Sequence, residues 1–449
     1  MKTPIIDFVE NYKQKDAVRL HMPGHKGKSF LGFESLDITE IEGADVLYSA
    51  NGIIEESQRN AAKLFGTGAT LYSCEGSSLS IRAMLYLAML ASQNKKKTVL
   101  AARNAHKTFM NCAAMLDFDI EWLYTENSDV LSCIVLPDTL NRKLSSMPEK
   151  PVAVYITSPD YLGNVSDIES LARVCRKHGV LLLCDNAHGA YRHFLKKSQH
   201  PIALGADMCC DSAHKTLPVL TGGGYLHIGK TAPDILSKNA KKAMSLFAST
   251  SPSYLILQSL DMANKYMDEE IKERLVYCAE RVQNLKKALT DKGFELVGNE
   301  ELKITIAPKN YGYTGEEISR YLLDNNIVCE FQDPDYAVMM FTGEINPKEF
   351  EKLESVLLNL TRKPAITLTA PKYIPGRKIM SVREAVFSPW EAVPTEKSKG
   401  KILARDNVSC PPAIPIAVCG EEINESAIEL FNYYGITEVE VVTDFPSEL

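Results

Sequence analysis

The chain has 449 residues, of which 45% are hydrophobic and 24% charged, and its formal net charge is −7. These proportions are typical of globular proteins, and the length predicts two or three domains with substantial cores. The negative charge argues against nucleic acid or an anionic membrane surface as the main partner, as does the lack of a basic cluster with interleaved aromatic residues.

The N-terminal stretch MKTPIIDFVENYKQKD carries charges throughout and has no apolar core of a signal peptide. Apolar runs such as VLLLC at 180–184 are far too short to cross a bilayer. The 11 cysteines are scattered without a CxxC pair, a pattern typical of reduced thiols and not of a disulfide framework or a zinc site. We therefore expect a cytoplasmic protein with no membrane partner, no nucleic-acid partner and no metal.

Between about residues 60 and 230, helical and strand patterns alternate, which predicts a parallel sheet covered by helices. The segment 151–157 is an apolar, β-branched strand, and 166–179 is an amphipathic helix that ends at a glycine. Residues 180–184 form the next buried strand, and 206–212 form a further one. Polar or ionisable residues follow each strand directly, at the edge where open α/β sheets bind ligands.

The pattern changes near residue 267. A long charged helix over 267–293 precedes short strands, a helix at 315–326 and a helix from Pro347, which together predict a smaller α+β domain. Beyond residue 362 the chain is rich in proline, which predicts a third, irregular unit. We expect an N-terminal segment with a large domain over 1–265, a small α+β domain over 266–362 and a C-terminal subdomain over 363–449.

The first segment with chemical potential is CEGSSLSIRAMLYLAML at 74–90, where Gly76, Ser77 and Ser78 stand at the start of an apolar helix. Backbone N–H groups and hydroxyls converge at such a start and can bind a phosphate. The simpler alternative is that Ser77 or Ser78 only caps the helix.

The second segment is ARNAHKTFMN at 102–111, which follows the strand-like TVLAA. Its His106 lies at a strand-to-helix junction. A histidine there could stack on a flat heteroaromatic ring, or it could merely cap the helix.

The third segment is LLLCDNAHGAYRHF at 181–194, in which Asp185 ends a buried strand. An unpaired carboxylate is costly there, and a protonated pyridine nitrogen is one cationic partner that would satisfy it. Such a pair keeps the ring cationic, so that it can accept electrons. The alternatives are backbone donors or a salt bridge; a metal site with His188 is less favoured because no third ligand is evident.

The fourth segment is CDSAHKTLPVLTGGGYL at 210–226, in which Lys215 follows a strand end. A partly desolvated lysine can lose its proton and attack an aldehyde, and the neighbouring Ser212 and His214 could reach a phosphate and a reacting carbon. In chain order, the four segments supply a phosphate cup, a ring-stacking histidine, a pyridinium-binding aspartate and a Schiff-base lysine. This order predicts the large domain of a fold type I enzyme that uses pyridoxal 5'-phosphate (PLP).

Several motifs resemble the prokaryotic ornithine/lysine/arginine decarboxylase family. They are HMPGHKG at 21–27, DNAHGA at 185–190 and SAHKTLP at 212–218, with further stretches at 37–66, 249–261 and 410–421. The resemblance spans nearly the whole chain. It implies an aspartate-aminotransferase-like α/β large domain with a parallel-rich sheet, and decarboxylation of a basic amino acid with PLP as cofactor.

The resemblance also implies roles for single residues. Lys215 would hold the cofactor, Asp185 would bind the pyridine nitrogen, and His214 or Lys215 would return a proton to the substrate. The implied cofactor-binding set is Gly76, Ser77, Ser78, His106, Asp185, Ala187, His188, Ser212, His214, Lys215 and Ser251. Within it, His106 would stack on one ring face with Ala187 near the other, and Ser251 would reach the phosphate of a neighbouring subunit. A homodimer would then be the smallest active unit.

The chain departs from the family pattern in three ways. It is shorter than the acid-induced members and has no room for their N-terminal response-regulator-like domain. His188 stands where the longer members carry a tryptophan. The late motif reads CPPAIP and CGE where the family has YPPGIP and PGE, which leaves open what Cys410, Ala413 and Cys419 contribute to the substrate pocket.

The short form favours arginine as substrate, giving agmatine, over lysine or ornithine. A cationic side chain needs an acidic or carbonyl-lined pocket. Candidate carboxylates are Glu40, Glu42, Asp45, Glu384 and Glu396. Two alternatives remain: another fold type I reaction such as transamination, for which Arg320 or Arg362 would clamp the substrate carboxylate, and a non-catalytic regulatory relative.

Overall fold

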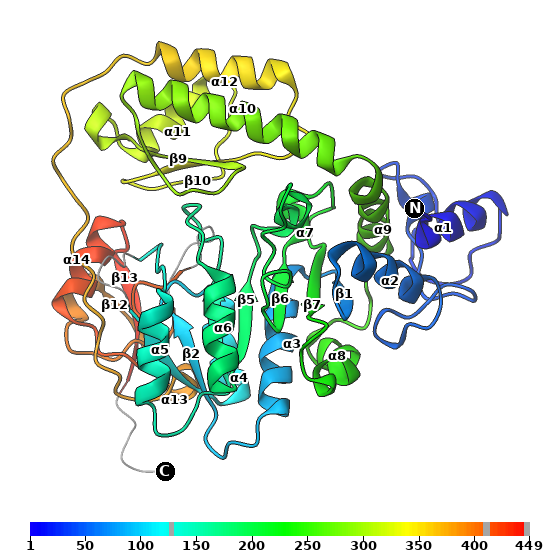
Figure 1. Cartoon of the computed structure of the whole chain (residues 1–449), viewed down its shortest axis with the longest axis horizontal. Coiled ribbons are helices and arrows are strands. Elements are labelled where there is room, and N and C mark those ends of the chain that lie inside the picture. The colour runs from blue at the N-terminus through cyan, green and yellow to red at the C-terminus, as the bar shows by residue number, and fades with distance from the viewer. Residues whose placement is uncertain (125–129, 407–413, 444–449) are drawn as a thin grey trace. The chain divides into compact units, whose positions relative to one another are not determined.

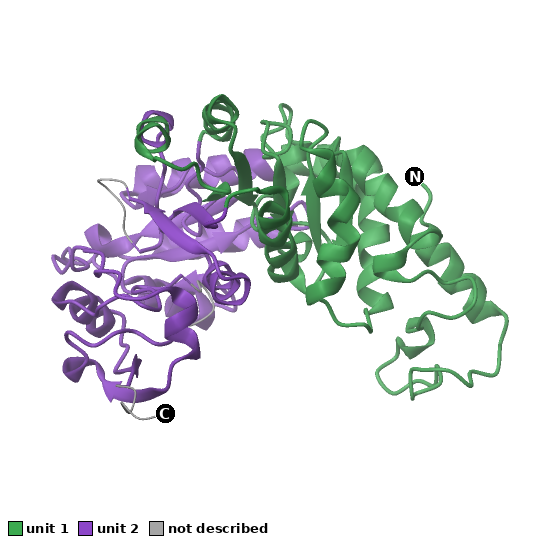
Figure 2. Ribbon diagram, turned by 90° about the horizontal axis from the view of Figure 1, so that it is seen from below, with its two compact units in different colours: residues 1–94, 141–158, 167–276 green, residues 95–140, 159–166, 277–449 purple. Residues whose placement is uncertain are grey.

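The computed structural model of the chain describes residues 1–124, 130–406 and 414–443. Its strands form a seven-stranded sheet in the order β1-β7-β6-β5-β4-β2-β3, a four-stranded sheet in the order β10-β11-β9-β8, and the pair β12-β13 (Figure 1). The chain divides into two compact units, which are coloured separately in Figure 2. Unit 1 consists of residues 1–94, 141–158 and 167–276, and unit 2 of residues 95–140, 159–166 and 277–449.

The large sheet is mostly parallel, as the alternating helix and strand pattern predicts. The pairs β2–β3, β4–β5 and β5–β6 are parallel, and β7 runs antiparallel to both β1 and β6. Its strands are β1 (Ala69–Ser73), β2 (Thr98–Ala102), β3 (Asp119–Leu123), β4 (Ala153–Thr157), β5 (Leu181–Asp185), β6 (Met208–Asp211) and β7 (Gly224–Ile228).

Helix patterning in unit 1 follows burial. Helix α3 (Gly76–Ala91) is apolar on most sides because both its faces are covered, whereas α6 (Ile168–His178) is amphipathic and buries one stripe. Asp167 caps the start of α6, and Gly179 ends it in the left-handed conformation. The other helices of unit 1 are α1 (Pro4–Gln14), α2 (Ile53–Phe65), α7 (Ala213–Thr216), α8 (Asp234–Phe247) and α9 (Tyr254–Glu269).

The small sheet of unit 2 consists of antiparallel strands, as expected for an α+β domain. Its helices α11 (Gly315–Asp324) and α12 (Pro347–Asn359) each begin with a capping box, made by Thr314 with Glu317 and by Asn346 with Glu349. The strands are β8 (Glu295–Val297), β9 (Lys303–Ala307), β10 (Phe331–Gln332) and β11 (Ala337–Met340), and unit 2 also contains α4 (Lys107–Leu116).

Two sequence expectations about helices and loops differ from the structure. The single helix expected over 267–293 is two helices, because α9 ends at Glu269 and α10 spans Ile271–Lys292. Glu270 lies outside helical geometry, with φ −125° and ψ −34°. Three successive carboxylates stand at 268–270. They are repelled by the negatively polarised C-terminal end of a helix and attracted by the positively polarised start of the next one, which explains the break.

The stretch after residue 362 is more regular than its proline content suggests. It contains α13 (Val382–Phe387), α14 (Glu425–Tyr433) and the antiparallel pair β12 (Trp390–Pro394) and β13 (Glu438–Val442). Residues from this stretch share one apolar core with earlier parts of unit 2, among them Tyr161, Phe331 and Phe431. The domain boundaries expected at residues 265 and 362 stay predictions. α5 (Pro137–Ser146) completes the α-helices, and none among the described residues is long and apolar enough to span a bilayer.

Asp45 ties the N-terminal segment to the start of α2. Its carboxylate accepts backbone N–H bonds from Gly52 at 2.8 Å, from Ile54 at 3.1 Å and from Glu55 at 3.2 Å, so it satisfies the free donors of that helix. Burial raises the pKa of Asp45, but these backbone bonds outweigh it and leave the pKa below its usual value. This candidate substrate-binding acid is therefore already saturated by the backbone.

We predict that Asp45→Ala lowers the free energy of unfolding by ~2–3 kcal/mol, because several helix N–H groups lose a charged acceptor. Urea denaturation followed by circular dichroism measures this change. The matched control is Glu42→Ala, since Glu42 is exposed in the same segment. Equal stability of the two variants would contradict the capping role.

Candidate active site

The start of α3 lies against β6 and β7 in unit 1. Gly76 is the first helical residue, with φ +66°, and Ser212 Oγ donates to Ser77 Oγ at 2.8 Å. A Cβ atom on Gly224 would lie 2.9 Å from the carbonyl oxygen of Asp211 and 3.0 Å from the carbonyl carbon of Gly76, so only glycine permits this approach.

The N-cap residue of α3 is Glu75, without a side-chain capping bond. Ser77 and Ser78 therefore lie within the first turn, and the alternative that they only cap the helix is wrong. First-turn N–H groups and the hydroxyls of Ser77 and Ser212 form a donor set that suits a phosphate.

Asp185 is 3% exposed at the end of β5. Its carboxylate accepts from the Tyr155 hydroxyl at 3.0 Å, from the backbone N–H of Ala187 at 3.2 Å and from the Cys210 thiol at 3.5 Å. All three donors are neutral. The carboxylate is thus held in place by neutral donors, which suits a cationic ring nitrogen.

Lys215 lies in the short helix α7, directly after β6. Its Nζ is 3.0 Å from His188 Nε2, which belongs to the turn that follows Asp185. His214 Nδ1 donates to the carbonyl oxygen of Gly223 at 2.9 Å, and this fixes the ring next to the glycine-rich turn. The structure thus brings Lys215 to His188 and Ser212 to Ser77 within unit 1.

His106 and Ser251 make local contacts of their own. His106, in unit 2, is the N-cap of α4, and its Nδ1 accepts from the backbone N–H of Thr108 at 3.2 Å. The expected capping role is therefore real, and ring stacking stays a prediction. Ser251 is exposed between α8 and α9, and its backbone N–H donates to Ser249 Oγ at 3.2 Å.

Sequence patterns did not point to the hydrogen-bond partners of Asp185, or to those of Asp211 at the end of β6. Tyr155 and Cys210 read as ordinary buried strand residues, yet both contact Asp185. The fully buried Asp211 accepts from His200 Nε2 at 3.0 Å and from His227 Nε2 at 3.1 Å. The one signal for this contact is a charged residue that ends the apolar run of β6.

These imidazoles lie in an apolar cluster around the ring of Phe65. Burial lowers the pKa of His227, and burial with the charges of His200 and His227 lowers the pKa of His193 to about 4. Burial raises the pKa of Asp211, but the charges and hydrogen bonds of His200 and His227 outweigh it and leave the pKa lowered.

We predict that the free energy of unfolding falls as the pH drops from about 6.5 to about 4. In this window the unfolded chain protonates His193 while the folded chain keeps it neutral, so protons favour the unfolded state. The loss from this residue is on the order of 2 kcal/mol. Denaturant titrations at several pH values measure the slope, and His193→Gln should make it shallower. A slope unchanged in this variant would contradict the assignment.

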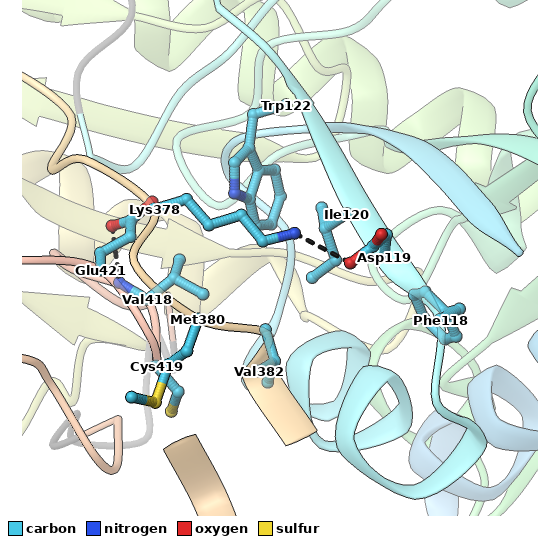
Figure 3. A pocket seen from close by; sticks show the side chains of 10 residues that line it. All are labelled: Phe118, Asp119, Ile120, Trp122, Lys378, Met380, Val382, Val418, Cys419 and Glu421. Carbon is cyan, nitrogen blue, oxygen red and sulfur yellow. Dashed lines mark hydrogen bonds and ion pairs between the residues drawn. The ribbon is translucent and has the colours of Figure 1, made fainter. Parts of the chain in front are cut away.

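The C-terminal motif contributes buried residues to unit 2. Cys419 Sγ donates to Asp406 Oδ1 at 3.0 Å, and Glu421 accepts the backbone N–H of Val418 at 3.0 Å. Figure 3 shows Cys419 and Glu421 lining a pocket with the Lys378–Asp119 ion pair. The space in it that water can occupy is small, about 30 Å³. Cys410 and Ala413 lie outside the described residues.

The other candidate carboxylates for binding the substrate are either exposed or already hydrogen-bonded within the chain. Glu40, Glu42 and Glu396 are exposed, and Glu384 accepts the backbone N–H of Ser381 at 2.7 Å in the capping box of α13.

Arg320 and Arg362 are the two candidate arginines for binding the substrate carboxylate in a transamination. Arg320 is exposed on α11, and the Arg362 guanidinium lies over the ring of Tyr311.

A family model described as "Orn/Lys/Arg decarboxylase, major domain" matches residues 3–308. The chain belongs to this family. It is 27% identical to an arginine decarboxylase of Halalkalibacterium halodurans over 95% of this chain and 92% of that protein. Its identity to an arginine decarboxylase of Bacillus subtilis is also 27%, with the same coverage. The constitutive lysine decarboxylase of E. coli superposes on 98% of this chain and 82% of its own, with a TM-score of 0.78 and 18% identity.

The family comprises PLP-dependent decarboxylases of basic amino acids, and the fold is the α/β fold of type I PLP enzymes. The family and the fold that the sequence predicts are therefore confirmed. The roles of single residues are not tested by these likenesses.

Proposed function

We propose that this chain binds PLP through Lys215 and decarboxylates a basic L-amino acid, with arginine as the favoured substrate and agmatine as product. One observation carries the proposal. Lys215 Nζ lies 3.0 Å from His188 Nε2, and His188 belongs to the turn that begins at the buried Asp185. A lysine and a proton acceptor are thus in contact at the carboxyl edge of the sheet, in the turn that Asp185 begins.

The residues of unit 1 fit the cofactor by the chemistry of their donors. The first turn of α3, with Gly76, Ser77 and Ser78, would hold the phosphate together with Ser212. The carboxylate of Asp185 would hold the ring nitrogen protonated. When bound, PLP supplies an electron sink for the pair of electrons released with carbon dioxide.

The remaining residues would orient groups and move protons. His188 Nε2 is placed to take a proton from Lys215 Nζ, which leaves a neutral amine that can act as a nucleophile. His214 or Lys215 would then return a proton to the substrate carbon. His106 would cover one ring face and Ala187 the other.

A second copy of the chain would complete the site. The N-terminal segment exposes large apolar side chains, with Val18 at 84%, Leu20 at 89%, Phe30 at 77% and Leu31 at 77%. Such a surface is costly in water and suits burial against a partner. A homodimer would cover it, and Ser251 would reach the partner's phosphate.

Arginine is favoured because the relatives from Halalkalibacterium halodurans and Bacillus subtilis, each matched over 92% of its length, are named arginine decarboxylases. A reducing, cytoplasmic location is favoured because all the described cysteines are free, among them the buried Cys184 and Cys209.

The test is to incubate the PLP-loaded protein separately with arginine, lysine and ornithine and to measure agmatine, cadaverine and putrescine by mass spectrometry. We expect agmatine to dominate. Lys215→Ala should abolish turnover, and Asp185→Asn should lower kcat by at least about a hundredfold because the ring nitrogen loses its anion.

Glu351→Gln is the matched control for Asp185→Asn, because Glu351 is an exposed carboxylate on α12. Its activity should equal that of the wild type. A keto acid in place of an amine would point to transamination, and no product from any of the three substrates would refute the proposed function.

A further inference from the structure

Asp211 is a second buried carboxylate behind the proposed cofactor site. It ends β6, next to Asp185 at the end of β5, and it is 0% exposed. Its Oδ2 accepts from the imidazoles of His200 and His227, and its Oδ1 accepts from Asn186 Nδ2 at 2.7 Å. Three donors therefore hold this one carboxylate, whereas none of them reaches Asp185.

The imidazole of His227 is itself held by a second hydrogen bond. His227 lies opposite Cys209 in the β6–β7 ladder, and its Nδ1 accepts from Thr70 Oγ1 on β1 at 2.8 Å. A neutral His227 with its proton on Nε2 satisfies both contacts. The carboxylate of Asp211 is thus tied through His227 to two further strands, β7 and β1.

The same group includes Cys209, whose Sγ is 3.8 Å from His200 Nε2, so a metal ion is an alternative occupant. Burial raises the pKa of the Cys209 thiol well above its usual value, which keeps it protonated and a poor ligand. The separations of 3.0 and 3.1 Å between the two imidazole nitrogens and Asp211 Oδ2 are ordinary hydrogen-bond lengths. Hydrogen bonding accounts for the arrangement.

Asn186 is the link from Asp211 to the proposed site. It is 0% exposed, its backbone N–H donates to the carbonyl oxygen of Cys210 at 3.0 Å, and its carbonyl accepts from Gly189 at 2.8 Å. Asn186 therefore pins the turn 185–189, which carries Asp185, Ala187 and His188. Ser212, which contacts Ser77, directly follows Asp211 in the chain.

We propose that Asp211 is a positioning residue of the cofactor site, which acts through Asn186 on the turn 185–189 and through its own backbone on Ser212. The inference rests on the proposed function, because it assumes that this turn and Ser212 hold PLP. Asp211 itself touches neither the ring nor the phosphate. Its charge fixes a donor pattern that a neutral amide cannot reproduce.

The test compares Asp211→Asn with Asp261→Asn. Asp261 is an equally buried carboxylate in unit 1 that accepts from Ile5 N at 2.9 Å and Ile6 N at 3.2 Å, far along the chain from the turn. Cofactor-free protein is titrated with PLP, and the dissociation constant and the absorbance spectrum of the bound cofactor are recorded. Thermal unfolding of the cofactor-free variants is measured in parallel.

We expect Asp211→Asn to weaken PLP binding by about tenfold or more and to alter the spectrum, because an amide donor would face Asn186 Nδ2 or an imidazole N–H. Asp261→Asn should lower the melting temperature without changing either readout. Asn186→Ala should also weaken PLP binding, and the double variant should weaken it by less than the product of the two single effects, since one contact links the two residues.

Wild-type affinity and spectrum in folded Asp211→Asn would overturn the inference, as would an equal loss of affinity in Asp261→Asn. If Asp211→Asn does not fold, Asn186→Ala decides, and unchanged PLP binding in it would contradict the link. Failure of the wild-type protein to bind PLP would instead refute the proposed function itself.

Discussion

The fold places two carboxylates at the ends of neighbouring parallel strands and surrounds them differently, and the chemistry proposed for the protein depends on this difference. The carboxylate of Asp211 accepts hydrogen bonds from two imidazoles and an amide. These bonds hold strands and a turn together. Among the described residues, the hydrogen-bond donors to Asp185 are neutral, so its charge remains available for a cation. Burying a carboxylate without a cationic partner costs free energy, and a protonated ring nitrogen would offset that cost.

The glycine-rich turn after α7 makes the other half of the site possible. At Gly224, the first residue of β7, the backbones of β6 and α3 both come closer than any side chain would permit. This approach places Ser212 against Ser77 and sets the helix start beside His214. The residues of the proposed phosphate site and Lys215 thus come together where β6, β7 and α3 contact one another.

Much of this arrangement could be predicted from the sequence, because it depends on local patterns. Apolar periodicity and the residues that interrupt it indicate where strands end and helices start. They also indicate that Asp185 and Lys215 follow strand ends in that order. The partners of Asp211 could not be predicted, since His200 comes from a loop, His227 from an antiparallel strand and Asn186 from a different strand end. Asp45 was a candidate for substrate binding because its capping contacts, six to ten residues distant, do not show in periodicity. The helix break at Glu270 depends on helix-end electrostatics that an amphipathic pattern does not reveal.

The most direct test of the central claim is to find where the cofactor is attached. The purified protein is incubated with PLP, reduced with borohydride, digested and analysed by peptide mass spectrometry. We expect a phosphopyridoxyl group on the peptide that contains Lys215 and on no other lysine at comparable yield. Full modification of a different lysine, with Lys215 untouched, would contradict it.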